Sequence, residues 1–224
     1  MTPRLALTFD DGPDPDDTPA LLELLARHAS PATFFVWGEQ AERFPEVVKA
    51  TIAAGHAVQP HCWAHRSHNE LSAAELRADI DRVTGLLAEL GAPAPTLWRP
   101  PYGHVNGRAT ERVARERGLA LTGWTIDSLD YRGTAAGEMR EAVTRALAEQ
   151  RRGLAVLLAH DSAREPGQQA RRADASQTRA LVQALLGERR YEPVALARGL
   201  RAGLDYGSRR SRARAAIRRL APER

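Results

Sequence analysis

The stretch Thr-Phe-Asp-Asp-Gly-Pro at residues 8–13 decides how this 224-residue chain is interpreted. Apolar residues 5–7 lead into it as a buried strand would, and Gly12-Pro13 ends that strand. Two adjacent carboxylates repel each other unless a cation lies between them or one takes a proton. Successive side chains of a strand point in opposite directions, so Asp10 and Asp11 can have different roles. The pattern favours one metal ligand and one base; a plain Asp-Gly turn is the alternative.

Strand-like and helix-like segments alternate along the rest of the chain. We expect strands at residues 5–10, 32–36, 57–58, 96–98, 119–124, 154–158 and 193–194. Helices are expected at 17–28, 45–54, 73–90, 110–117, 136–150 and 177–186, the third starting at a capping box of Ser72 and Glu75. This order predicts an α/β fold, a distorted (β/α) barrel of about seven parallel strands. The barrel is assigned to residues 1–203.

Polar residues gather where the expected strands end. These residues are Asp10 and Asp11, His61, Arg99, Asp127 to Asp130, and His160, each at the carboxyl end of an expected strand. In a barrel of parallel strands the carboxyl ends form one rim, and active sites lie on that rim. The sequence therefore predicts an enzyme whose active site draws on several strands.

Three of the rim residues could bind a metal ion. His61 and His65 are spaced i, i+4, so on a helical turn both imidazoles would project from one face. With Asp11 they give two imidazoles and one carboxylate and leave positions open, as catalytic sites do. Zn²⁺ suits these ligands, and Co²⁺, Ni²⁺ or Fe²⁺ could replace it. A purely structural histidine pair and a non-haem iron oxygenase are the alternatives, and the helix-rich alternation argues against the oxygenase.

Five motifs occur in an order that resembles a known family. They are TFDDGP at 8–13, HxxxH at 61–65, RPPYG at 99–103, DxxD followed by an aromatic residue at 127–131, and LxH at 158–160. From about residue 5 to residue 195 the chain resembles the polysaccharide deacetylases with a NodB-type domain, carbohydrate esterase family 4. The resemblance assigns the metal to the same three residues singled out above.

The resemblance also implies catalytic roles. Asp10 is the expected general base, and Arg99 orients it and pairs with its charge. The backbone N–H of Tyr102 is expected to bind the oxyanion. His160 is the expected general acid, tuned by Asp130. These parts meet the needs of amide hydrolysis, which requires an activated water, a stabilised oxyanion and a proton for the departing amine.

Substrate contacts are expected from Tyr131, Leu158, Pro101 and Trp124, with Leu158 lining the acetyl pocket. The chain departs from the family pattern at Cys62, at Tyr131 and, to a minor extent, at Ala159 and Ser162 beside His160. Cys62 stands between the metal histidines where Ser or Thr is usual, which weakens an expected loop hydrogen bond. Tyr131 replaces the usual tryptophan wall of the sugar groove and can still stack, with less area.

The implied function is a metal-dependent deacetylase that hydrolyses the N-acetyl group of an amino sugar, in an oligosaccharide, a polysaccharide or a sugar-bearing metabolite. The products are acetate and a free amine, and the partner is an acetylated carbohydrate. An O-acetyl sugar esterase uses the same machinery and is the alternative. An inactive carbohydrate-binding barrel is a further alternative, although it would be expected to lack Asp10 or a metal ligand.

Several polar residues also have simpler interpretations. Arg99 could brace a loop between prolines, and His160 with Asp161 could cap a strand end. Asp127 could form an Asx turn. We expect His68 and His104 to be solvated loop residues.

The composition limits location and partners. No apolar run approaches the roughly 20 residues of a membrane helix. No export signal is recognisable, so a cytoplasmic location is expected. The single cysteine excludes a disulfide framework and a thiolate metal cluster. The tail, residues 204–224, is rich in arginine and could form an amphipathic helix on a membrane or anionic surface, or remain solvated. No recognised nucleic-acid-binding module occurs.

Overall fold

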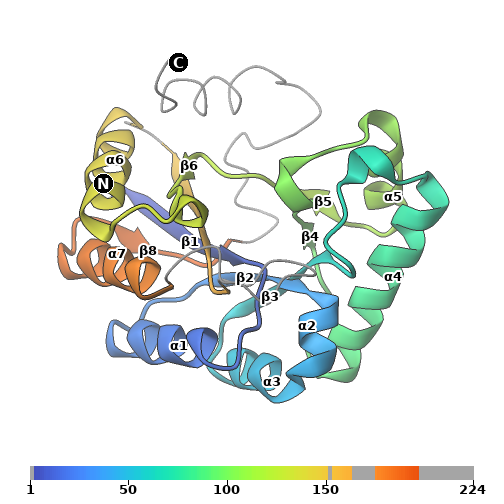
Figure 1. Ribbon diagram of the computed structural model, residues 1–224, viewed down its shortest axis with the longest axis horizontal. Helices are drawn as coiled ribbons and strands as arrows, with labels where there is room; N and C mark the ends of the chain where they lie inside the picture. The colour runs from blue at the N-terminus through green and yellow to red at the C-terminus, as the bar shows by residue number, and fades with distance from the viewer. Residues whose placement is uncertain (1–2, 151–152, 163–174, 197–224) are drawn as a thin grey trace.

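The structure of the protein is a computed structural model that describes residues 3–150, 153–162 and 175–196. The strands are β1 (Arg4–Asp10), β2 (Thr33–Trp37), β3 (Ala57–Cys62), β4 (Leu97–Trp98), β5 (Ala120–Leu121), β6 (Ile126–Asp127), β7 (Leu154–His160) and β8 (Glu192–Pro193). The α-helices are α1 (Asp17–Arg27), α2 (Gly38–Arg43), α3 (Pro45–Ala53), α4 (Ala73–Glu89), α5 (Gly107–Glu116), α6 (Ala136–Glu149) and α7 (Ala175–Gly187). Short 3₁₀ turns are η1 (His68–Glu70), η2 (Pro101–Gly103) and η3 (Asp130–Arg132). Figure 1 shows the helices arranged around the strands.

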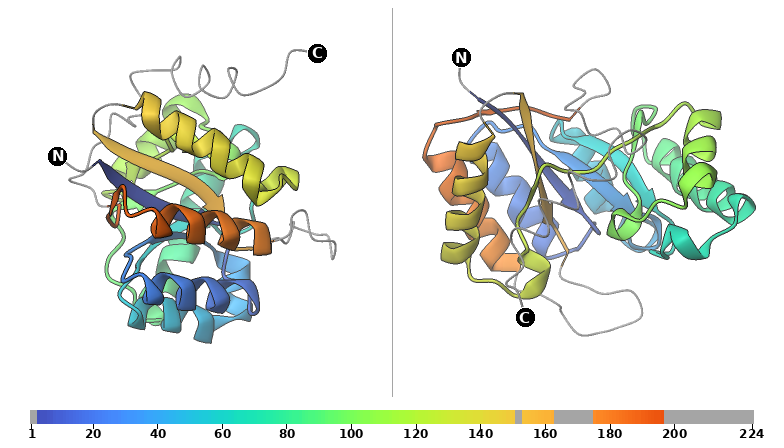
Figure 2. Two further views of the ribbon diagram at one scale, coloured as in Figure 1. Left: turned by 90° about the vertical axis from the view of Figure 1, so that its left-hand side faces the viewer. Right: turned by 90° about the horizontal axis from the view of Figure 1, so that it is seen from above.

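The strands form a ring that backbone hydrogen bonds close only in part. The main sheet runs in the order β3-β2-β1-β7-β6, while β4 and β5 form a separate parallel pair. At the break between β3 and β4, the side-chain oxygen of Gln59 accepts hydrogen bonds from the backbone N–H groups of Thr96 (2.9 Å) and Leu97 (2.8 Å). Both views of Figure 2 show β1 (blue) and β7 (gold) side by side in the main sheet. The distorted α/β barrel expected from the sequence is confirmed.

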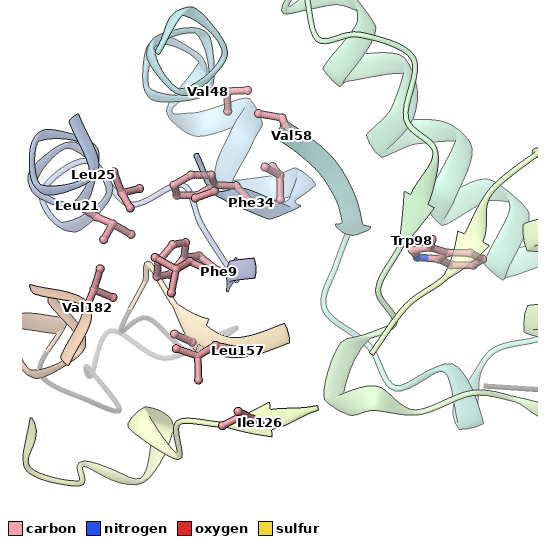
Figure 3. Packing of buried hydrophobic residues seen from close by; sticks show 14 of the residues in the cluster. Phe9, Leu21, Leu25, Phe34, Val48, Val58, Trp98, Ile126, Leu157 and Val182 are labelled. Atoms are coloured by element: carbon pink, nitrogen blue, oxygen red, sulfur yellow. The ribbon is translucent and has the colours of Figure 1, made fainter. Parts of the chain in front are cut away.

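Alternation along β1 and β7 divides the core into two parts. One face of β1 carries Leu5, Leu7 and Phe9, which belong to the large cluster between strands and helices. Figure 3 shows Phe9 near Leu21 of α1. The other face carries Ala6, which belongs to a smaller cluster inside the ring. Burying a side chain such as Phe or Leu contributes about 1.5–3 kcal/mol, so this alternation fixes which face of each strand points inward.

The strand predicted at residues 119–124 is shorter in the structure, so the predicted extent is wrong. The structure has only β5 there, and β6 begins separately at Ile126. The cause is a change of partner: the N–H of Thr122 still bonds to the carbonyl of Trp98 (3.0 Å), whereas the N–H of Thr125 bonds to Val156 of β7 (2.9 Å). The chain crosses between the two ladders at this point. β6 thus joins the ring, while β8 pairs only with the first residues of β1.

The capping box at the start of α4 is confirmed. The hydroxyl of Ser72 accepts from the N–H of Glu75 (3.3 Å), and the Glu75 carboxylate accepts from the N–H of Ser72 (2.8 Å). None of the helices described is long and apolar enough to span a bilayer. The arginine-rich tail, residues 204–224, and its boundary with the barrel lie outside the described residues.

Candidate active site

The residues expected to do chemistry gather at the carboxyl ends of the strands. Asp10 ends β1 and His160 ends β7, and the register of these parallel strands places the two residues opposite each other. His61 lies near the end of β3, and Arg99 directly follows β4. These residues therefore approach one another across the same rim, although up to 150 positions separate them in sequence.

Arg99 holds Asp10 in place. Its Nη1 donates to Oδ1 of Asp10 (2.7 Å) and to the hydroxyl of Thr8 (2.8 Å). Its Nη2 donates to the carbonyl of Gly123 (2.8 Å), and its Cζ lies 4.1 Å from the centre of the Phe35 ring. The guanidinium is fully buried, and a buried charge requires such pairing. The pair is thus fixed in position and charge-matched.

Asp11, His61 and His65 form the candidate metal site. Oδ1 of Asp11 lies 3.2 Å from Nε2 of His61 and 2.9 Å from Nε2 of His65. Among the described residues, neither this oxygen nor the ring nitrogens of His61 has a partner in hydrogen-bonding geometry, although all are buried. Buried polar atoms are normally satisfied, so a divalent cation between them fits this group.

The charge state of Asp11 agrees with cation binding. Burial raises the pKa of Asp11, but the imidazoles of His65 and His61 oppose it and bring the pKa well below its usual range. Asp11 is therefore held as a carboxylate, the form that binds metal ions.

The two metal-site histidines do not lie on a helical turn, and this expectation is wrong. β3 continues through His61 to Cys62, and the chain then bends so that His65 has φ +43°. Asp11 also has a positive φ, +74°. Both are left-handed conformations that cost free energy for residues other than glycine. The imidazoles and the carboxylate converge because the backbone is held in this unusual shape.

His160 is bound to a second carboxylate. Its Nδ1 lies 2.7 Å from Oδ1 of Asp130, and its backbone N–H donates to Oδ2 of the same residue (2.8 Å). Thr178 of α7 and the N–H of Tyr131 also donate to Asp130, each at 2.9 Å. Burial alone lowers the pKa of His160, but Asp130, with smaller contributions from the charges of Asp11 and Asp10, raises it to about 10. With Nδ1 occupied, Nε2 points towards Asp11 and lies 3.9 Å from its Oδ2.

Tyr102 and Pro101 lie in the turn η2, beside the candidate metal site. Tyr102 has φ +58°, and its side chain is 47% exposed. Its hydroxyl lies 3.1 Å from Nδ1 of His65, whereas Pro101 is buried. The turn thus brings the Tyr102 ring and backbone to the same rim as the histidines.

The other expected substrate contacts border His160. The Tyr131 ring meets the His160 imidazole edge-on, with centroids 5.7 Å apart. Leu158 lies two residues before His160 on the same face of β7 and is buried. Trp124 packs on the inner cluster, and its ring centre lies 5.8 Å from Cζ of Arg99.

Two further expectations concern histidines near the site. His68 is fully buried with its ring 4.9 Å from that of Trp98, so its prediction as a solvated loop residue is wrong. Burial lowers the pKa of His68 to about 3, which keeps it neutral and allows it to pack in the core. His104 is exposed as expected and bonds to Ser67.

Asp161, considered from the sequence only as part of a strand-end cap, connects the end of β7 to the loop after β1. Its carboxylate accepts from the N–H of Gly12 (3.0 Å) and from the hydroxyl of Thr18 (2.7 Å). A Cβ at Gly12 would lie only 2.1 Å from an Asp161 oxygen, so only glycine fits. Burial raises the pKa of Asp161 to about 7.

The Asp127 carboxylate accepts from the N–H of Leu129 (2.9 Å), as in an Asx turn.

Fold and site together define a (β/α) barrel with a candidate divalent-metal centre on its catalytic rim. The chain belongs to the polysaccharide deacetylase family, whose model matches residues 2–121. A chitooligosaccharide deacetylase from Bradyrhizobium sp. (strain ANU 289) is 33% identical over 185 residues, which cover 82% of each protein. A peptidoglycan-N-acetylglucosamine deacetylase from Bacillus cereus (strain ATCC 14579) is 37% identical over 133 residues. That match covers 59% of this chain and 48% of the relative, so the chain spans about half of that protein.

Solved structures agree with the family assignment. The crystal structure of a peptidoglycan N-acetylglucosamine deacetylase aligns with a TM-score of 0.73 and 29% identity, covering 86% of each chain. A family 4 carbohydrate esterase from Streptomyces lividans, in complex with acetate, aligns with a TM-score of 0.67 and 30% identity. That alignment covers 82% of this chain and 87% of the esterase.

Proposed function

We propose that this protein is a metal-dependent deacetylase that hydrolyses the N-acetyl group of an N-acetylated amino sugar to acetate and a free amine. The observation that carries the proposal is the convergence of three groups on one rim: the Asp10–Arg99 pair, the Asp11–His61–His65 set and the His160–Asp130 pair. The similar deacetylases of chitooligosaccharide and peptidoglycan support an N-acetylated sugar as the substrate.

Asp11, His61 and His65 would hold the metal ion. Two imidazoles and a carboxylate favour Zn²⁺, and Co²⁺ or Ni²⁺ could replace it. A divalent cation bound there would polarise the acetyl carbonyl and lower the pKa of the attacking water.

Asp10 is the proposed general base. Its Oδ1 is held by Arg99 at 2.7 Å, so the orientation of the carboxylate is fixed before substrate arrives. In this position Asp10 would take the proton of the water that attacks the acetyl carbon. The backbone N–H of Tyr102 is the proposed donor to the oxyanion that forms on the former carbonyl oxygen.

His160 is the proposed general acid for the departing amine. With its pKa raised to about 10, the imidazole carries a proton at neutral pH. Asp130 holds Nδ1, so Nε2 is the nitrogen that would deliver the proton to the amine.

Four residues are proposed to bind the sugar and the acetyl group. Tyr131 would form one wall of the sugar groove beside His160. Leu158 would line the acetyl pocket, bordered by Pro101 of the turn η2 and by Trp124 of the segment between β5 and β6.

The test is acetate release after the protein has been treated with a chelator and reloaded with Zn²⁺ or Co²⁺. The substrates are chitooligosaccharides, N-acetylglucosamine conjugates, peptidoglycan fragments and acetylated xylan. We expect metal-restored release from one or more amide substrates, and release slower by about 10²-fold or more from the Asp10→Asn variant. Release from acetylated xylan alone would instead establish an O-acetyl esterase. No release from any substrate by metal-loaded protein would contradict the proposed activity.

A further inference from the structure

A carboxylate that the proposed mechanism does not use holds the loop between His61 and His65. Asp79 lies on α4, and its Oδ1 accepts a hydrogen bond from the backbone N–H of Trp63 (2.8 Å). Its Oδ2 accepts from the N–H of Ala64 at 3.4 Å. These N–H groups belong to the two residues directly before His65, so Asp79 acts on the backbone that leads into this ligand.

The same loop is fixed on its other side by Trp63. Its carbonyl accepts from the N–H of Glu39 (3.1 Å), and its ring lies against Gly38, where a Cβ would be 2.6 Å from a ring carbon. Cζ of Arg82 lies 3.5 Å from the centre of the same ring. Trp63 is therefore enclosed, and its peptide groups bond to α2 on one side and to Asp79 of α4 on the other.

This loop needs external support because of its conformation. His65 has φ +43°, which a residue with a Cβ adopts only where the surroundings impose it. Cys62 follows His61 at the start of the loop, and its thiol sulfur is a weak acceptor. It can therefore hold the loop backbone less firmly than a hydroxyl would.

Asp79 can provide that support because α4 is firmly attached to the core. Leu76, Ile80 and Val83 of the same helix are each fully buried. Asp79 lies between the first two of them, at the edge of the apolar stripe. The capping box fixes the helix start one turn earlier. The carboxylate therefore has a rigid base from which to bind the loop.

We infer that Asp79 is a positioning residue for the candidate metal site, and that its two hydrogen bonds hold His65 where its Nε2 meets Asp11 and His61. The inference rests on the proposed function, since it requires a metal at these three residues. Partners that orient metal ligands without touching the ion commonly account for 10- to 100-fold in metal affinity. Asp79 does not contact a ligand side chain; it acts through the backbone N–H groups of Trp63 and Ala64, which precede the ligand His65.

The experiment measures the Zn²⁺ dissociation constant of the full chain by competition with a chromophoric chelator. We expect Asp79→Ala to raise that constant about 10-fold or more. Asp79→Asn should raise it less, because its amide oxygen can still accept from the N–H of Trp63. The Co²⁺-loaded variants should also show a changed visible absorption spectrum, which reports the ligand geometry and not the stability of the fold.

Asp81→Asn is the matched control. Asp81 lies on the same helix, but its carboxylate pairs with Arg117 at the surface, away from the loop. We expect this variant to keep the Zn²⁺ affinity and the Co²⁺ spectrum of the unmodified protein. If Asp79→Ala does not fold, the affinity and spectrum of Asp79→Asn decide the matter.

Three results would overturn the inference. The first is an unchanged dissociation constant and spectrum in the folded Asp79 variants while the unmodified protein binds one Zn²⁺. The second is an equal loss of affinity in Asp81→Asn, which would indicate a general effect of α4. The third is the absence of Zn²⁺ binding by the unmodified protein, which would overturn the proposed metal site as well.

Discussion

Two histidine–carboxylate groups face each other across the rim, and they differ in how completely their atoms are satisfied. In the pair of His160 and Asp130, the carboxylate accepts four hydrogen bonds and the imidazole has a 2.7 Å partner. In the group of Asp11, His61 and His65, Oδ1 of Asp11 lies 3.2 Å and 2.9 Å from the two Nε2 atoms, but without hydrogen-bonding geometry. The first group is complete within the protein, whereas the second is arranged to receive a cation.

The largest expected effect comes from breaking the second group. His61→Ala removes one of three candidate ligands, so both Zn²⁺ binding and acetate release should be lost. A bound metal supplies several kcal/mol of transition-state stabilisation, which corresponds to about 10³-fold or more in rate. The measurement is acetate release together with zinc content after dialysis. Retention of one Zn²⁺ per chain by this variant would show that the metal lies elsewhere.

Asp10→Asn tests whether the neighbouring carboxylate is separate from the metal group. The variant keeps the side-chain shape but cannot take a proton from water, so kcat should fall about 10²- to 10⁴-fold. Zn²⁺ affinity, measured by chelator competition, should stay within about threefold of the unmodified protein. Because Arg99 loses its charged partner, a thermal melt is the necessary control for folding. Loss of the metal in a folded variant would contradict the division of roles between Asp10 and Asp11.

Asp130→Asn tests the complete group through pH dependence. The folded-state pKa of His160 is raised to about 10, so the acid form is active and activity falls as pH rises through that pKa. Removing the negative charge should lower this pKa, and the basic limb of the kcat profile should move to lower pH. The same sign applies to stability: the contribution of the pair is full below about pH 6.5 and is lost as pH rises through about 10. A basic limb at the same pH in the variant would exclude His160 as the general acid.

Thr178→Val is the smallest change to the same group. It removes the hydroxyl that donates to Asp130 at 2.9 Å and leaves the charge pair intact. Loss of this buried bond should lower the free energy of unfolding by about 1–2 kcal/mol in a urea titration. The basic limb of the kcat profile should stay close to that of the unmodified protein. A shift as large as that of Asp130→Asn would show that the hydroxyl, and not the carboxylate charge, controls His160.

The active-site rim could be predicted from the sequence because its polar residues stand at the ends of the apolar runs that form the strands. Asp10 and His160 each close an apolar run, and parallel strands bring such positions together. The extents of β5 and β6 could not be predicted, since the chain changes partner between Thr122 and Thr125 and only the tertiary structure sets those partners.

Asp79 was not identified from the sequence, and His68 was wrongly predicted to be solvated, for a different reason. Neither residue belongs to a motif, and each acts through a contact with a distant segment. One local signal was present for Asp79: an acidic side chain between Leu76 and Ile80, at the edge of the apolar stripe of α4. An acidic residue at such a position predicts a buried hydrogen-bonding role, although not which partner it finds.

The Gln59 side chain has a consequence for the dynamics of the barrel. Where a neighbouring strand would supply a ladder, the side-chain oxygen of Gln59 joins β3 to the start of β4. Nearer the carboxyl ends, the N–H of Arg99 bonds to Pro60 (3.4 Å) and the indole N–H of Trp98 to the carbonyl of His61 (3.0 Å). One rotamer change would release both N–H groups, whereas separating β1 from β7 requires breaking a register of seven residue pairs. We therefore expect two cooperative units in native-state hydrogen exchange, with the amides of Thr96 and Leu97 exchanging well before those of β1. Arg99 directly follows β4 of the less protected unit, and Asp10 ends β1 of the more protected unit. Their ion pair therefore connects the two units.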